Sequence, residues 1–241
     1  MTGERAARAA LALILAAFVT LGVLYAVYTP PWQAPDEPAH YNYIAQVAGA
    51  GCCPVIEAGD WDAAYLRRLT TEQFPEAADL SPLEYEDHQP PLYYLLGAAV
   101  FGLSGGSLLA LRLMSVTLGA GVVLSVYLAV ARVFPAREPL ALAAAAFAAF
   151  IPQHISVLAS VNNDALAELV LGVLVVLAAA YLGNPVAPRP GDGALRARAG
   201  RPHPALLGLL AVTGLRISRT GYPPPLPLTR PPITVPAPRP R

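Results

Sequence analysis

Four long apolar stretches determine what this chain can fold into. Residues 9–28 carry no charge, and twenty residues of α-helix span about 30 Å, the hydrocarbon thickness of a bilayer. Similar stretches cover 108–131, 139–158 and 165–182, the third of which Pro152 is expected to kink or end. Only 13% of the residues are charged, against roughly 25% in an average globular chain. The sequence therefore predicts an all-α, polytopic transmembrane protein, and it disfavours a disordered chain, a nucleic-acid binder and a disulfide-stapled secreted domain.

Arg5 and Arg8 precede the first apolar stretch, and Tyr28 and Trp32 lie at its far end. A basic cytoplasmic flank and an interfacial aromatic belt are typical of a transmembrane helix. A cleaved signal peptide is the alternative, but its apolar core would be about 7–15 residues long and would end at a small-residue cleavage site. We therefore favour an uncleaved signal-anchor helix over residues 9–28, with the N-terminus in the cytoplasm.

Residues 29–107 are predicted to form an extracytoplasmic loop that contains interfacial helices. Its first part, 29–88, holds eleven acids and only two basic side chains. The acids are Asp36, Glu37, Glu57, Asp60, Asp62, Glu72, Glu76, Asp79, Glu84, Glu86 and Asp87. Cys52 and Cys53 are adjacent in this loop, and because adjacent cysteines close only a strained ring, we expect no structural disulfide between them.

Residues 91–103 leave the topology open, because thirteen apolar residues are short for a span and typical of a re-entrant or interfacial helix. If they do not cross, Arg132, Arg137 and the nine arginines after residue 183 are cytoplasmic; if they cross, all of these lie outside. The positive-inside bias favours the first topology. That topology gathers a set of polar side chains at the outer face, namely Asp36, Glu37, His40, His88, Arg112, Asn162, Asn163 and Asp164.

A change of composition divides the chain into a transmembrane region, 1–183, and a tail, 184–241. The last 48 residues contain eleven prolines and eight arginines. Such a segment does not form a helix and has little apolar surface to bury, which favours a disordered cytoplasmic tail. Alternatively, the chain is truncated or read out of frame here, so that a fifth span was lost.

Asp36, Glu37 and His40 directly follow the first span, where an active site facing the outer leaflet would lie. On a helix, Asp36 and His40 share a face and can cooperate in proton transfer. Asp36 and Glu37 diverge by about 100° and would serve different partners. The structural alternative is that Asp36 caps a helix, with Glu37 favoured by the helix dipole and Pro38 in the first turn.

His88 and Gln89 precede Pro90, Pro91 and two tyrosines. Two prolines in a first turn, followed by tyrosines at the membrane interface, indicate a plain helix start. The functional interpretation is that His88 and Gln89 project into the same outer cavity as Asp36.

Arg112 is the only charge along the chain between Asp87 and Arg132. A charge inside hydrocarbon costs on the order of 3 kcal/mol and usually turns to a polar partner. Ser115 and Gly119 continue its helical face as a small-residue stripe suited to helix contact. Near the outer leaflet, Arg112 can hold a phosphate bidentately, or it can be an anchor that snorkels to lipid headgroups.

Asn163 and Asp164 precede the last apolar stretch, where either is an adequate helix N-cap. Glu168 lies one turn deeper, on the same face as Asp164. In an apolar helix Glu168 needs a partner or a proton.

Taken in order, these motifs resemble the GT-C superfamily of integral-membrane glycosyltransferases, in particular the dolichyl-phosphate-mannose protein mannosyltransferases and their bacterial relatives. The matching elements are Asp36-Glu37 after the first span, His88-Gln-Pro-Pro-Leu-Tyr-Tyr94, Arg112-Leu-Met-Ser115, and Asn162-Asn-Asp164 preceded by Pro152. The resemblance covers about residues 5–183. Since family members have many more spans than four, it implies the N-terminal portion of such an enzyme.

The resemblance implies transfer of a sugar from a polyprenyl-phosphate donor to an acceptor at the outer face of the bacterial inner membrane. It implies Asp36 as the base that deprotonates the acceptor hydroxyl, Glu37 as support for a metal or acceptor contact, and Arg112 as a ligand of the donor phosphate. The further substrate-binding candidates are His40, His88, Gln89, Asn163 and Asp164. A divalent metal ion is the cofactor to consider, and the expected partners are the bilayer and the lipid-linked sugar.

No nucleotide loop, zinc spacing or serine-hydrolase elbow occurs in the sequence, so a soluble nucleotide cofactor is not suggested. The non-catalytic alternative is a membrane scaffold or assembly subunit whose acidic loop binds a partner or cations. A transporter has less support, because four spans without an internal repeat give little from which to build alternating access.

Overall fold

The structure is a computed structural model that describes residues 2–183; the tail predicted for 184–241 lies outside the described residues. The described part of the chain contains helices and no strands. The helices, in chain order, are α1 (Thr2–Tyr28), α2 (Glu37–Ala50), α3 (Ala63–Thr71), α4 (Leu92–Ser104), α5 (Leu108–Val133), α6 (Glu138–Ala149), α7 (Pro152–Leu158) and α8 (Asp164–Gly183).

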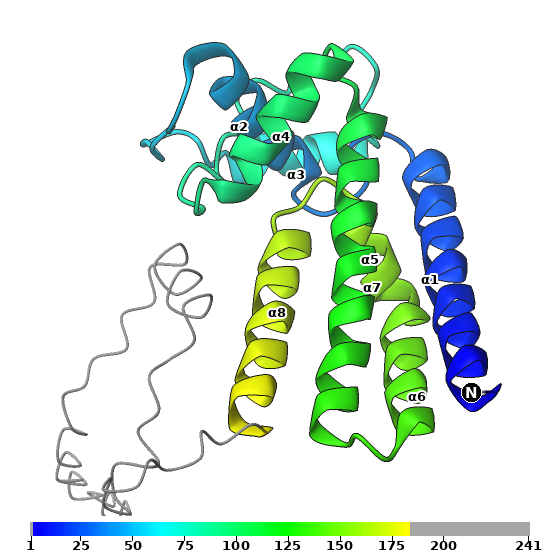
Figure 1. Cartoon of the computed structure of the whole chain (residues 1–241). Helices are drawn as coiled ribbons and strands as arrows, with labels where there is room; N and C mark the ends of the chain where they lie inside the picture. The colour runs from blue at the N-terminus through cyan, green and yellow to red at the C-terminus, as the bar shows by residue number, and fades with distance from the viewer. Residues whose placement is uncertain (1, 184–241) are drawn as a thin grey trace, which may run out of the picture.

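The longer helices run side by side, and α2, α3 and α4 gather at one end of them (Figure 1). Helices α1, α5 and α8 are long and apolar enough to cross a membrane. Helices α6 and α7 together make a fourth span if the bent pair is counted as one. The four spans predicted from hydropathy are therefore confirmed as helices, and the chain is a multi-pass membrane protein.

The bend between α6 and α7 lies where proline interrupts the helix. The two axes differ by 68°, and Ile151 between them has extended backbone. Proline has no N–H to continue the hydrogen-bond ladder, but it fits the first turn of a new helix. The kink predicted at Pro152 is confirmed.

Helix α5 is central and contacts α1, α4, α6, α7 and α8. A methyl group added to Gly119 would lie 2.9 Å from a ring carbon of Phe18 in α1 and 3.1 Å from Leu158 in α7. Ser115, one turn earlier, is fully buried. The small-residue stripe predicted on this face is therefore a surface where helices approach closely.

The segment 29–107, here called the head region, begins and ends at the same end of the bundle (Figure 1). Helix α4 lies in this region and packs against α2, so the ambiguous stretch 91–103 does not cross the bundle. Tyr94 stacks on Tyr43 of α2 with ring centroids 3.6 Å apart. The two tyrosines expected at the membrane interface are instead buried, Tyr94 against α2 and Tyr93 with its hydroxyl 2.8 Å from that of Ser115 in α5.

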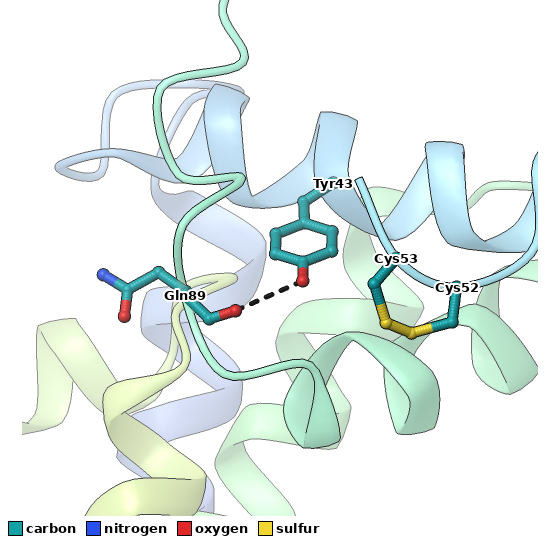
Figure 2. Close-up of a disulfide and its surroundings, with 4 residues drawn as sticks. All are labelled: Tyr43, Cys52, Cys53 and Gln89. Atoms are coloured by element: carbon teal, nitrogen blue, oxygen red, sulfur yellow. Dashed lines mark hydrogen bonds between the residues drawn. A yellow bond between two sulfur atoms is a disulfide. The ribbon is translucent and has the colours of Figure 1, made fainter. Parts of the chain in front are cut away.

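The expectation for the two cysteines was wrong. Cys52 and Cys53 are joined by a disulfide in the exposed segment that follows α2 (Figure 2). Their Cα atoms lie 3.0 Å apart.

Candidate functional site

Asp36 lies at the turn that joins the first span to α2. Its backbone is left-handed (φ 57°, ψ 2°), a conformation that aspartate tolerates better than most residues. The side chain is exposed and makes no capping hydrogen bond to α2. Instead, Oδ1 accepts a hydrogen bond of 2.9 Å from the hydroxyl of Tyr85. Asp36 thus occupies the N-cap position, but its carboxylate is held by a side chain and faces solvent.

Glu37, the next residue, is fully buried and pairs with Arg112 of α5. Arg112 donates from Nε to Oε1 at 2.7 Å and from Nη2 to Oε2 at 2.6 Å, the fork-to-fork geometry of a bidentate pair. The backbone N–H groups of Trp32 and Val161 also donate hydrogen bonds to this carboxylate, at 3.1 and 3.2 Å. The two neighbouring carboxylates therefore serve different partners, as predicted from their divergence on a helix.

The remaining N–H groups of Arg112 bind the end of α1. Nη1 donates to the carbonyls of Ala26 and Thr29, and Nη2 donates to the carbonyl of Pro30. A cation at a helix C-terminus also interacts favourably with the helix dipole. Arg112 is only 3% exposed, so it does not snorkel to the surface. In this conformation each of its five N–H groups has an acceptor in the chain, and none is left for a phosphate.

His40 lies inside the head region, and its Nδ1 is 2.8 Å from the hydroxyl of Tyr94. It makes no side-chain hydrogen bond to Asp36 among the described contacts, although the two share one face of α2. Burial lowers the pKa of His40 to about 4; the charge of Asp36 opposes this shift and that of His88 adds to it. His40 is therefore neutral at physiological pH.

His88 and Gln89 lie on a turn that Gln89 links to two other segments of the chain. His88 is exposed, and its Nδ1 lies at hydrogen-bonding distance, 3.0 Å, from the carbonyl oxygen of Tyr85. The backbone carbonyl of Gln89 accepts from the hydroxyl of Tyr43 at 3.2 Å, as Figure 2 shows. The amide oxygen of Gln89 accepts from Nδ2 of Asn163 at 3.1 Å. The predicted substrate-binding residues Gln89 and Asn163 are thus brought together from positions 74 residues apart.

Two residues near Asp36 carry no motif in the sequence. Tyr85 binds Asp36 directly, and burial, followed by the charge of Asp36, raises the pKa of Tyr85. Glu86 is 9% exposed, and its Oε2 accepts a hydrogen bond of 2.8 Å from Nε2 of Gln89. Burial is the largest cause that raises the pKa of Glu86, with Asp36 and Asp164 adding to it. Neither residue could be found by spacing, because each lies on a turn whose position depends on the tertiary fold.

An apolar groove of about 200 Å³ runs between α4 and α8. Leu92 and Tyr93 line it from α4, and Leu166 and Val170 line it from α8. Asn163 is its polar lining residue. The groove suits an alkyl chain. Asn163 at its lining donates a hydrogen bond to Gln89, and Gln89 donates one to Glu86, whose pKa the charge of Asp36 helps to raise.

Asp164 is exposed at the first position of α8, and its backbone N–H donates to the side chain of Asn162 at 2.8 Å. Glu168, one turn further, has the partner that an apolar helix requires. Its Oε2 is 2.7 Å from Nε2 of His154 in α7, whose Nδ1 lies 2.9 Å from the carbonyl of Ala148. This pair links α7 to α8 away from the head region.

None of the predicted catalytic or substrate-binding residues belongs to a group with metal-ligand spacing in the described part of the chain. The group that has such spacing there is Asp60, Glu84 and Asp87 of the head region.

Comparison with known proteins gives one match. Residues 88–185 match a family model described as dolichyl-phosphate-mannose-protein mannosyltransferase. The match begins at His88 and includes Arg112, Asn163 and Asp164, whereas Asp36 and Glu37 precede it. No curated protein and no solved structure matches the chain significantly.

Proposed function

We propose, from the match of residues 88–185 to the dolichyl-phosphate-mannose-protein mannosyltransferase model, that the chain is a GT-C-like membrane glycosyltransferase. It would transfer a sugar from a polyprenyl-phosphate donor to an acceptor hydroxyl at the outer face of the membrane. The observation that carries the proposal is the placement of Asp36. It is an exposed carboxylate of the head region, on the turn that joins α1 to α2, and the hydroxyl of Tyr85 holds it in place.

Asp36 acts as the general base. It takes the proton of the acceptor hydroxyl while the hydroxyl oxygen attacks the anomeric carbon of the sugar. The bond from this carbon to the phosphate oxygen breaks, its electron pair leaves with the polyprenyl phosphate, and the anomeric configuration inverts. A base must come within about 2.6–3.2 Å of the proton it removes, and an exposed, solvent-facing carboxylate is open to such an approach.

Glu37 and Arg112 position the base. The ion pair fixes the first residue of α2 against α1 and α5, so the turn that carries Asp36 cannot shift independently of the bundle. Because Arg112 has no free N–H in this conformation, we assign it this positioning role in place of direct phosphate binding. The imidazole of His88 is exposed, and its Nδ1 lies 3.0 Å from the carbonyl oxygen of Tyr85, so we assign the opposite edge of the ring to contact with the donor.

The groove between α4 and α8 takes the first isoprene units of the donor. Its lining is apolar apart from Asn163, as an alkyl chain at the edge of a bilayer requires. A lipid-linked donor never leaves the membrane, so its reacting phosphate must meet the base near the lipid boundary.

The two ends of the bundle carry opposite charges, which supports an orientation with the head region outside. The N-terminus and the turn between α5 and α6 lie at the end opposite the head region (Figure 1). Arg5, Arg8, Arg132 and Arg137 belong to that end, whereas the head region holds eleven acids in residues 29–88. By the positive-inside bias, the N-terminus is cytoplasmic and Asp36 faces outward, in a bacterial inner membrane.

The test is transfer from lipid-linked sugars by the purified chain in lipid vesicles, comparing the wild type with Asp36→Asn. Removing a positioned base costs roughly 10²–10⁴-fold in rate, so the variant should lose nearly all activity. Glu76→Gln is the matched control, since Glu76 is an exposed acid of the same region. Unimpaired transfer by Asp36→Asn, or no transfer by the wild type from any polyprenyl-phosphate sugar, would contradict the proposal.

Asp36→Glu separates an enzyme from a scaffold whose acidic loop binds a partner. A scaffold depends on loop charge and tolerates this exchange. A positioned base moves by a methylene group and should lose most of its activity.

A further inference from the structure

Three carboxylates of the head region converge without a basic partner. Asp60 lies between α2 and α3, whereas Glu84 and Asp87 lie between α3 and α4. One oxygen from each lies within 4.8 Å of the others. No arginine forms an ion pair with any of the three within residues 2–183. Three acids in this proximity repel one another unless a positive charge or protons lie between them.

The neutral donors that reach the cluster satisfy only part of it. Nε2 of Gln46 bridges Oε1 of Glu84 at 2.9 Å and Oδ2 of Asp87 at 3.1 Å. The backbone N–H of Glu57 donates to Oδ2 of Asp60. The carboxylate oxygens outnumber these donors, so the cluster retains unused acceptors.

Asp87 supplies a second and independent observation. Its side chain is directed into the cluster, where it shares the Gln46 amide with Glu84, and the residue is only 6% exposed. Its other oxygen, Oδ1, is buried and has no hydrogen-bond partner among the described residues. A buried carboxylate oxygen without a hydrogen-bond partner keeps its full desolvation penalty, so native proteins rarely hold one without a ligand.

We propose that Asp60, Glu84 and Asp87 bind a hard divalent cation, Ca²⁺ in the first instance. The donor set is oxygen alone, which suits Ca²⁺ and not the softer ions that histidine and cysteine select. Ca²⁺ binds its ligands at about 2.3–2.6 Å, so two ligands on opposite sides lie about 4.6–5.2 Å apart. The three oxygens all lie within 4.8 Å of one another, close enough for a single ion to reach all three. Water and backbone carbonyls complete the coordination.

The cation ties the segment after α2 to the turn before α4. That turn carries Tyr85, the residue that holds Asp36, so binding orders the surroundings of the candidate active site without sharing a residue with it. The proposal does not depend on glycosyl transfer. A scaffold with the same head region would bind the same ion.

Terbium luminescence tests the site directly, because Tb³⁺ occupies Ca²⁺ sites and is excited by a nearby tryptophan. Trp61 follows Asp60 and packs edge-on against Tyr85 at 4.7 Å, which places a sensitiser beside the cluster. With the full chain in a non-ionic detergent, we expect saturable Tb³⁺ emission that Ca²⁺ displaces. Trp61→Phe should reduce the emission and leave Ca²⁺ binding, measured by calorimetry, in place.

Asp87→Asn and Glu84→Gln should each weaken Tb³⁺ and Ca²⁺ binding by roughly tenfold or more, since affinity follows the number of charged ligands. Glu76→Gln, which removes an exposed acid elsewhere in the region, should not. Ca²⁺ should raise the unfolding temperature of the wild type over its value in EDTA, and not that of Asp87→Asn. Equal binding by wild type and Asp87→Asn, or no Ca²⁺ effect on the wild type, would overturn the proposal and leave protons as the species that the carboxylates share.

Discussion

Glu37 and Arg112 lie 75 residues apart and form a doubly hydrogen-bonded ion pair whose side chains are 0% and 4% exposed. The pair joins α2, which carries Glu37, to α5, which carries Arg112. Its further hydrogen bonds go to the C-terminal end of α1 and to the backbone before α8. Two charges of opposite sign are thus enclosed at the point where the head region joins the bundle. Several consequences of this junction, and of other contacts in the bundle, can be measured.

Glu37→Gln should strongly destabilise the protein, because it leaves the Arg112 charge buried without a counter-charge. Breaking a buried pair from one side costs about 3–5 kcal/mol. The check is thermal unfolding in detergent. Glu4→Gln is the control, since Glu4 forms an exposed pair with Arg8 and should change the unfolding temperature little. A small effect of Glu37→Gln, comparable with that of Glu4→Gln, would contradict this role.

Lowering the pH should destabilise the protein through His40. Its pKa in the folded state is about 4, below the ordinary value of 6.5, so the unfolded state binds the proton first as the pH falls. This contribution to stability is complete above pH 6.5 and is lost as the pH falls toward 4, on the order of 3 kcal/mol in all. In a pH series of unfolding temperatures, His40→Gln should therefore lose less stability than the wild type. Parallel curves for the two proteins would disprove the assignment.

Gly119→Ala should destabilise the bundle by about 1–3 kcal/mol, the usual range for overpacking. The new methyl group would lie 2.9 Å from the ring of Phe18, too close for contact without a shift. Gly102→Ala in α4 is the matched control, because no atom lies within 4 Å of the added carbon. Helix propensity alone should make that variant equally or slightly more stable. Combining Gly119→Ala with Phe18→Leu should restore part of the lost stability.

His154→Leu should destabilise the protein more than the double variant His154→Leu with Glu168→Leu. The single change leaves Glu168 in an apolar helix without its 2.7 Å partner, whereas the double change removes both polar groups. Unfolding temperatures of the two single variants and the double variant complete the cycle. Strictly additive losses would show that His154 and Glu168 do not interact.

The spans were predictable because a bilayer imposes a simple rule. Apolar stretches long enough to cross the hydrocarbon must be helices there, so hydropathy located α1, α5 and α8, and a proline located the bend before α7. The short stretch 91–103 forms α4, which packs against α2 within the head region. The sidedness that the charge argument assigned to the arginines stays a prediction.

The partners of the ionisable residues were not predictable in the same way. Tyr85 holds Asp36 across 49 residues, and no spacing rule connects a loop tyrosine to a distant turn. The need of Arg112 for a polar partner was evident from its apolar surroundings, but its choice of Glu37 depends on how α2 docks. The disulfide between Cys52 and Cys53 was missed because the prediction assumed an unfavourable ring.

The N–H of Val161 is the last hydrogen-bond donor to reach the carboxylate of Glu37. During synthesis, the first helix and the head region emerge long before this residue does. In the nascent chain the support of Asp36 therefore stays incomplete until α6 and α7 have been synthesised and Val161 has followed them. Chains released earlier by the ribosome would have every candidate catalytic residue of the first two helices and lack the enclosed junction that holds them.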